Sequence, residues 1–84
     1  MSIDELIREV SSIETSSKEM TSRVAAAAQS LSTSNTALTS LVRGNKKGEE
    51  AVLAVAAAVS SLRKATVAVH SLTDACEKCI GELS

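Results

Sequence analysis

The residues that break helices are concentrated at one place in this chain, close to its midpoint. Among 84 residues there is no proline, and two of the three glycines lie in the segment Arg43-Gly44-Asn45-Lys46-Lys47-Gly48. An all-β chain of this length would need turn residues about every 8 to 12 positions. The distribution of breakers therefore predicts a single all-α domain, with one long helix on either side of residues 43–48.

The first half of the chain carries an apolar stripe with alternating spacings of three and four residues. It is interrupted only by two serines: Ile3, Leu6, Val10, Ile13, Ser17, Met20, Val24, Ala27, Leu31, Ser34, Leu38 and Leu41. A repeat of 3.5 residues keeps one face of a helix toward a partner along its whole length. Ser2 and Glu5 have the spacing of a capping box. We expect one helix over about residues 3–42.

The second half continues the same spacing, and its apolar face is wider. The stripe contains Ala51, Val55, Ala58, Leu62, Ala65, Val69, Leu72, Cys76, Cys79 and Leu83, and beside it lie Val52, Ala54, Val59, Ala68, Ala75 and Ile80. This pattern predicts a helix over about residues 49–82. Because one partner helix would not cover such a wide face, we also expect a second contact surface.

The connection between the two helices is short, so they are expected to be antiparallel neighbours. In the predicted turn, residues 43–48, Gly44 suits the left-handed conformation that closes a helix and Asn45 suits a helix N-cap, while Gly48 completes the turn. Such a hairpin leaves each seam open on one side, which favours a four-helix bundle formed with other helices. The residues expected at helix interfaces are Leu31, Leu38, Leu41, Val55, Leu62, Val69 and Leu72.

Composition excludes several classes of partner. Nine Lys and Arg against ten Asp and Glu provide no basic face for nucleic acid, and no aromatic residue is present to stack on a base. The longest uncharged stretch, residues 24–42, is rich in Ser and Thr, so we expect no stable membrane insertion. The segment Met1-Ser2-Ile3-Asp4-Glu5 does not have the pattern of a signal peptide. We therefore expect the protein to stay inside the cell or to leave by a signal-independent route.

Two groups of residues have spacings that can carry chemistry. Cys76-Glu77-Lys78-Cys79 is a C-x-x-C, which is compatible with seam packing, with oxidation, or with half of a metal site. Both cysteines fall on the apolar stripe, which favours packing. His70 and Asp74 lie one helical turn apart, but no nucleophile or cleft accompanies them, which favours a solvated surface pair. The sequence predicts no enzyme activity, no cofactor and no metal.

The turn also carries a resemblance to a known family. Two helices of about forty residues, joined by Val42-Arg43-Gly44, resemble the small substrates of the type VII (ESX/Ess) secretion pathway, the Trp-x-Gly superfamily. The Gly of that motif is present here, and the Trp is absent. The longer segment from Val42 to Ala51 is similar to the turn of the Trp-lacking branch that accompanies LXG-type toxins, in which a Gly-Asn precedes a polar helix start.

The resemblance implies a function in secretion. The export signal of that family is an aromatic residue followed by an acid four positions later, and the resemblance assigns this role to His70 and Asp74. It implies a secreted protein, exported as a homodimer or with a helical heteropartner such as an LXG-type toxin, and recognised by a secretion ATPase. The alternative is a cytoplasmic structural or adaptor subunit of a helical assembly, of which a polymerising type III needle subunit would be one form.

Overall fold

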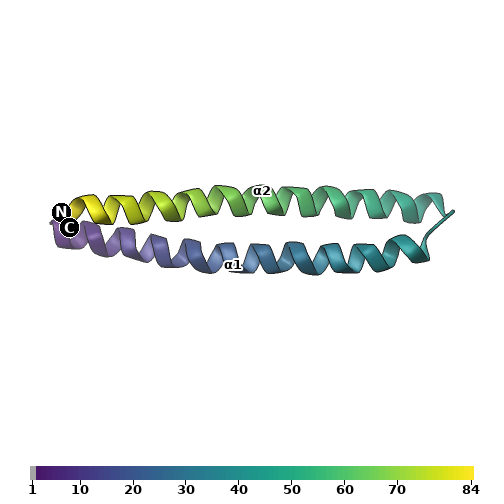
Figure 1. The fold of residues 1–84 in the computed structure, drawn as a ribbon, viewed down its shortest axis with the longest axis horizontal. Coiled ribbons are helices and arrows are strands. Elements are labelled where there is room, and N and C mark those ends of the chain that lie inside the picture. Colours follow the sequence, from purple (N-terminus) through teal and green to yellow (C-terminus); the bar gives the residue numbers. More distant parts are fainter. Residues whose placement is uncertain (1) are drawn as a thin grey trace.

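The computed structural model describes residues 2–84 as two long helices, α1 (Ile3–Leu41) and α2 (Lys46–Leu83). The helices lie side by side and antiparallel over their whole length, so that the start of α1 lies next to the end of α2 (Figure 1). The hairpin measures 62 × 17 × 14 Å. The predicted all-α antiparallel hairpin is confirmed, while its assembly into a four-helix bundle stays a prediction.

Helix α1 begins with the cap that the sequence indicates. Ser2 has an extended backbone, and its Oγ accepts a hydrogen bond of 3.1 Å from the backbone N–H of Glu5. Asp4 and Glu5 place negative charge beside the unpaired N–H groups of the first turn, which the helix dipole favours. No glycine or proline follows until Gly44, so nothing interrupts the 39 residues of the helix.

The turn is shorter than predicted. The backbone N–H of Asn45 donates to the carbonyl oxygen of Val42 at 2.8 Å, and Gly44 between them has φ +82°, the value required at the third position of a type II turn. Asn45 then caps α2, because its side chain accepts from the N–H of Gly48 at 3.0 Å. The predicted turn, 43–48, was wrong at its end, since the Asn45 cap lets α2 start at Lys46.

Gly48 therefore lies inside the first turn of α2 rather than in the loop. A Cβ atom at this position would collide with the side chain of Val42, whose Cγ1 lies 2.7 Å from the place that the Cβ would occupy. The absence of a side chain lets the end of α1 approach α2 closely. Gly48 is thus needed for packing, and Gly44 is the residue that supplies the positive φ.

The seam between the helices differs from the predicted stripes at every second position. Alternate stripe members do lie between the helices, among them Val24, Val55 and Leu62. Most of the remaining positions are displaced by one residue. The seam contains Glu14, Thr21, Ala28 and Asn35 of α1, the C-cap residue Val42, and Val52, Val59, Thr66, Thr73 and Ile80 of α2. The predicted stripe residues that are exposed instead are Ile3, Ile13, Met20, Ala27, Leu31, Ser34, Leu41, Ala51, Ala58, Ala65 and Leu72.

The displacement has a physical cause in the turn and in the shape of the hairpin. Val42 packs closely on Gly48 at the turn, a contact that fits the observed rotation of the two helices relative to each other. A seam between only two helices is reached by water from both sides, so polar residues such as Thr21 and Thr66 lie there at little cost. The larger apolar side chains are thereby left on the flanks of the hairpin.

Within residues 2–84, α2 is the one helix long and apolar enough to cross a membrane by length and composition. Its most apolar window of 18 residues has a mean hydropathy of 1.6, and 6% of that window is buried in the hairpin. The other residues of that window therefore keep at least part of their surface accessible to solvent. The expected absence of stable membrane insertion stays a prediction.

Candidate interaction surface

The two long sides of the hairpin differ in chemical character. One groove along the hairpin is lined by residues that include Ile13, Ser16, Met20 and Leu72. We define the apolar side as these positions together with the positions that follow them at intervals of seven residues along each helix. These rows are Ile13, Ser16, Met20, Arg23, Ala27, Ser30, Ser34, Ala37 and Leu41 on α1, and Ala51, Ala54, Ala58, Ser61, Ala65, Ala68, Leu72, Ala75 and Cys79 on α2. Arg23 is the one charged residue in the middle of these rows, and one heptad further toward the ends the same rows reach the exposed Glu9, Lys47 and Glu82.

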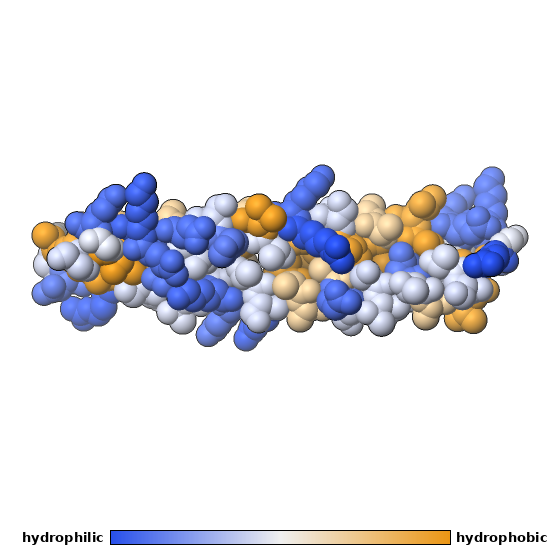
Figure 2. Space-filling model, viewed as in Figure 1, coloured by the Kyte–Doolittle hydropathy of each residue, from blue (hydrophilic) through white to orange (hydrophobic). Residues whose placement is uncertain are grey.

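The opposite flank, here called the charged side, presents ionisable groups from both helices. One groove on it is lined by Lys18, Thr21, His70, Thr73, Asp74 and Glu77, and the next contains Ala25, Ala28, Gln29, Arg63 and Thr66. Figure 2 shows one long face of the molecule, on which hydrophilic side chains occur along both helices with smaller hydrophobic areas between them. Apolar side chains are exposed beside these charges as well, with Leu53 near Glu49 and Val67 near Arg63 exposed by 70% and 68%.

Large apolar side chains on the apolar side are strongly exposed. The exposed fraction is 48% for Ile13, 51% for Met20, 47% for Leu72 and 83% for Leu41. Exposed apolar residues that recur along one side mark a contact surface more often than single ones do. The chain is thus an extended and largely exposed hairpin whose apolar side is open.

The residues predicted at helix interfaces divide into two groups. Leu38, Val55, Leu62 and Val69 are partly buried and lie between α1 and α2. Leu31, Leu41 and Leu72 are exposed. The first group stabilises the hairpin, and the second is available to other helices.

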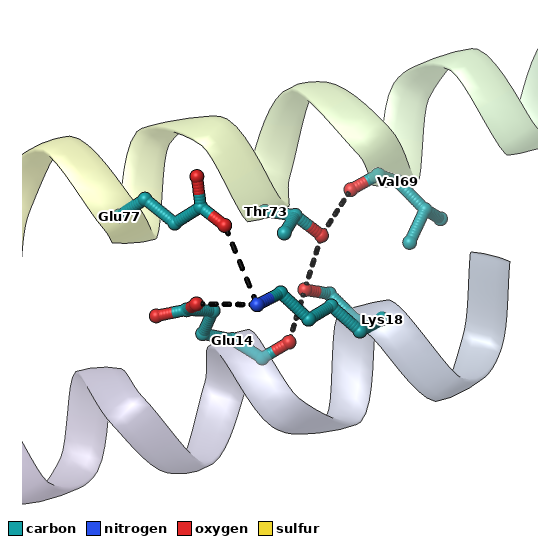
Figure 3. A network of polar contacts seen from close by, with 6 residues as sticks. Glu14, Lys18, Val69, Thr73 and Glu77 are labelled. Atoms are coloured by element: carbon teal, nitrogen blue, oxygen red, sulfur yellow. Dashed lines mark hydrogen bonds and ion pairs between the residues drawn. The ribbon is translucent and has the colours of Figure 1, made fainter.

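A network of polar contacts crosses the seam near the open end of the hairpin (Figure 3). The hydroxyl groups of Ser17 and Thr73 lie 2.6 Å apart and are buried. Lys18 Nζ lies 2.9 Å from Glu14 Oε1 on its own helix and 3.4 Å from Glu77 Oε1 on α2. The hydrogen bond to Glu14, and then that to Glu77, raises the pKa of Lys18 above its ordinary value of 10.5. These contacts hold residues 14–18 opposite residues 73–77.

A second polar contact lies closer to the turn. Asn35 Nδ2 donates to the carbonyl oxygen of Val52 at 3.1 Å, and the buried Oδ1 of Asn35 has no partner. The apolar stripes predicted no role for Asn35 or Thr73, because a polar residue counts as an interruption of such a stripe. Ser17 on the stripe was the one signal that could have indicated a polar seam.

The His70–Asp74 pair and the two cysteines occupy different parts of the hairpin. His70 and Asp74 are exposed on the charged side and line the same groove. Cys76 is buried in the seam, Cys79 is partly buried, and both are free thiols. Among residues 2–84 no group of three or more His, Cys, Asp or Glu side chains could hold a metal ion.

Comparison with known proteins adds no family to this description. No protein-family model, no curated protein and no solved structure matches the chain significantly. The resemblance to type VII secretion substrates therefore has no support beyond the residues on which it was based.

Proposed function

We propose that this protein is a helix-association module that binds other α-helices with its apolar side. The observation that carries the proposal is the amount of exposed surface. The accessible area is 6000 Å², whereas a compact monomer of 8.7 kDa exposes about 4,700 Å². The excess of about 1,300 Å² exceeds the ~800 Å² that each partner buries in a standard interface.

The two sides of the hairpin then have separate tasks. Helices of a partner would cover Ile13, Met20, Leu41 and Leu72, whose burial is favourable because each removes apolar area from water. The charged side would stay in solvent. His70 and Asp74 would remain accessible to a further protein while the apolar side is occupied.

A matched pair of substitutions in α2 tests this proposal. Ala58 and Ala56 are both exposed, but Ala58 belongs to the apolar side and Ala56 lies beside Ser60 and Arg63 on the outer surface. We expect Ala58→Glu to abolish association, because an unpaired charge would be buried in the contact, and Ala56→Glu to leave it unchanged. Light scattering of each variant measures the assembly mass. Equal masses for the two variants would contradict the proposal.

Among helix-association modules, we propose that this protein is one secreted by a type VII pathway as the partner of an LXG-type toxin. The secretion ATPase of that pathway would recognise His70 and Asp74. Support comes from the resemblance of residues 42–51 and from the accessibility of these two side chains. Deletion of the ATPase in the native host should remove the protein from the medium. His70→Ala with Asp74→Ala should do the same while leaving the assembly mass unchanged. Retention in the cell in every strain would favour the cytoplasmic subunit instead.

A further inference from the structure

We propose that Cys76 and Cys79 form a redox latch at the open end of the hairpin. While both thiols are reduced, the end of α2 stays packed on α1. Oxidation to an intrachain disulfide, by a small disulfide such as oxidised glutathione, releases residues 76–83 from α1. The inference concerns contacts within one chain, so it does not depend on the proposed function.

The two cysteines lie in the part of α2 that closes the open end. Cys76 is 6% exposed and lies in the seam, whereas Cys79 is partly exposed. Cys76 lies between two residues of α2 that contact α1. Thr73 Oγ1 lies 2.6 Å from a hydroxyl group of α1, and Glu77 Oε1 lies 3.4 Å from Lys18 Nζ (Figure 3). A movement of Cys76 out of the seam would disturb both contacts.

A regular helix holds the two thiols too far apart to bond. The Cβ atoms of residues three positions apart on a helix are separated by about 5–6 Å, whereas a disulfide needs a separation of about 3.5–4.5 Å. Both cysteines lie within α2, which is helical as far as Leu83. A bond between them therefore requires residues 76–79 to leave the helical conformation. Only one turn of helix would remain beyond this break, and a single turn is not stable alone.

Exposure determines the order in which the thiols react. The thiolate of Cys79, the more exposed of the two, attacks one sulfur of oxidised glutathione and displaces one glutathione thiolate. The thiolate of Cys76 then attacks Cys79 Sγ and displaces the second. In total the chain gives up two electrons and two protons, which the two glutathione molecules carry away as thiols. The second step opens the latch, because the buried sulfur of Cys76 must leave the seam to reach Cys79.

Oxidation and closure of the open end therefore oppose each other. A bridge that forms only when the end of α2 is released lowers the stability of the hairpin, and unfolding favours the bridge by the same factor. An ordinary structural disulfide has the opposite effect, because it constrains the unfolded chain and so stabilises the folded one. The sign of the change in stability thus distinguishes a latch from a structural disulfide.

Equilibration of the full chain with mixtures of reduced and oxidised glutathione, in buffer and in urea, tests the proposal. Alkylation of free thiols followed by mass spectrometry measures the oxidised fraction. We expect the equilibrium constant for oxidation to be at least about tenfold larger in the unfolded chain, equivalent to about 1.4 kcal/mol. The oxidised hairpin should unfold at a correspondingly lower urea concentration. Its amide hydrogen exchange should be faster at residues 73–83 and unchanged in the part of α2 near the turn.

A C-x-x-C placed outside the seam is the matched control. Cys76→Ala with Cys79→Ala removes the native thiols, and Lys78→Cys with Gly81→Cys places a new pair at two exposed positions. Oxidation of this pair distorts the same end of α2 but leaves position 76 in the seam. Hydrogen exchange at residues 73–77 should therefore stay slow in the oxidised control.

Each outcome decides for or against the latch. An oxidised native chain that is as stable as the reduced one, or more stable, would overturn it. A product of two chains joined by a disulfide, or equally fast exchange at residues 73–77 in the native and control pairs, would also overturn it. A less stable intrachain product, with faster exchange confined to the open end, would support the inference.

Discussion

At the scale of single residues, Ser17 and Thr73 are the most informative pair. They are 3% and 5% exposed, and their hydroxyl groups contact each other as well as the backbone carbonyls of Glu14 and Val69. With one proton each, the two hydroxyl groups make two of these three hydrogen bonds at a time, so neither group is left without a partner. Because the hydrogen bond works only at one register, the pair also determines which residues of α1 and α2 face each other.

Replacing one member of the pair should cost more than replacing both. Ser17→Ala is expected to lower the free energy of unfolding by about 1 kcal/mol, because Thr73 loses a buried partner. Ser17→Ala combined with Thr73→Val should recover most of this loss, because no buried hydroxyl remains. Urea unfolding measures both values, and the exposed Ser16→Ala serves as the control, with a change within about 0.5 kcal/mol. Additive losses in the double variant would contradict the interpretation.

Lys18 predicts a dependence of stability on alkaline pH. Its pKa in the folded chain is raised by its hydrogen bonds to Glu14 and Glu77, so folding favours the protonated form. The contribution is fully present below the ordinary pKa of 10.5 and is lost as the pH rises through the raised value. We expect a small decrease in Tm above about pH 10.5 that is absent in Lys18→Met. The effect is small because the side chain is exposed. An identical alkaline decrease in both proteins would refute it.

At the scale of the helices, local signals were predictable and the rotation of the helices was not. The Ser2 cap, the Asn45 cap and the uninterrupted run of 39 residues follow from residue types, because caps and breakers act within one turn. Whether Ile13 or Glu14 lies in the seam does not follow from residue types within one turn. Both rows of α1 fit a 3.5 spacing, and only contacts between the two helices, such as those of Val42 with Gly48 and of Ser17 with Thr73, distinguish them.

Glycine substitutions test this account of the turn. Gly48→Ala should destabilise the hairpin, because a Cβ would collide with Val42, and Val42→Ala in the same chain should restore part of the loss. Gly81→Ala is the matched control within α2, since no atom lies within 4 Å of its added Cβ. It should stabilise by up to about 0.5–1 kcal/mol. Thermal unfolding followed by circular dichroism measures all three, and equal effects of the two single substitutions would contradict the packing role of Gly48.

At the scale of the whole molecule, the hairpin has little interior. Ala28, Val59 and Cys76 are its buried hydrophobic residues among positions 2–84, and none of them is large. Small domains of this kind gain much of their stability from association, which depends on concentration. Stability and function are therefore expected to depend on the same apolar side.

Thermal stability should accordingly change with protein concentration. For a two-chain assembly, a tenfold dilution removes about 1.4 kcal/mol of stability per assembly, which should lower Tm by several degrees. Ala58→Glu should melt at a lower temperature that does not change on dilution, whereas Ala56→Glu should behave as the native chain does. Calorimetry over a hundredfold range of concentration measures this. A Tm of the native chain that is independent of concentration would contradict association.

The amino-acid sequence by itself determined the two helices, their caps and the place where the chain reverses, because these depend on residues within one helical turn of each other. It also determined that more apolar surface exists than one seam can cover. The tertiary structure decided which apolar row faces inward and which polar residues, Ser17, Asn35 and Thr73, lie between the helices. That choice depends on contacts between the two helices, and neither helix carries the information alone.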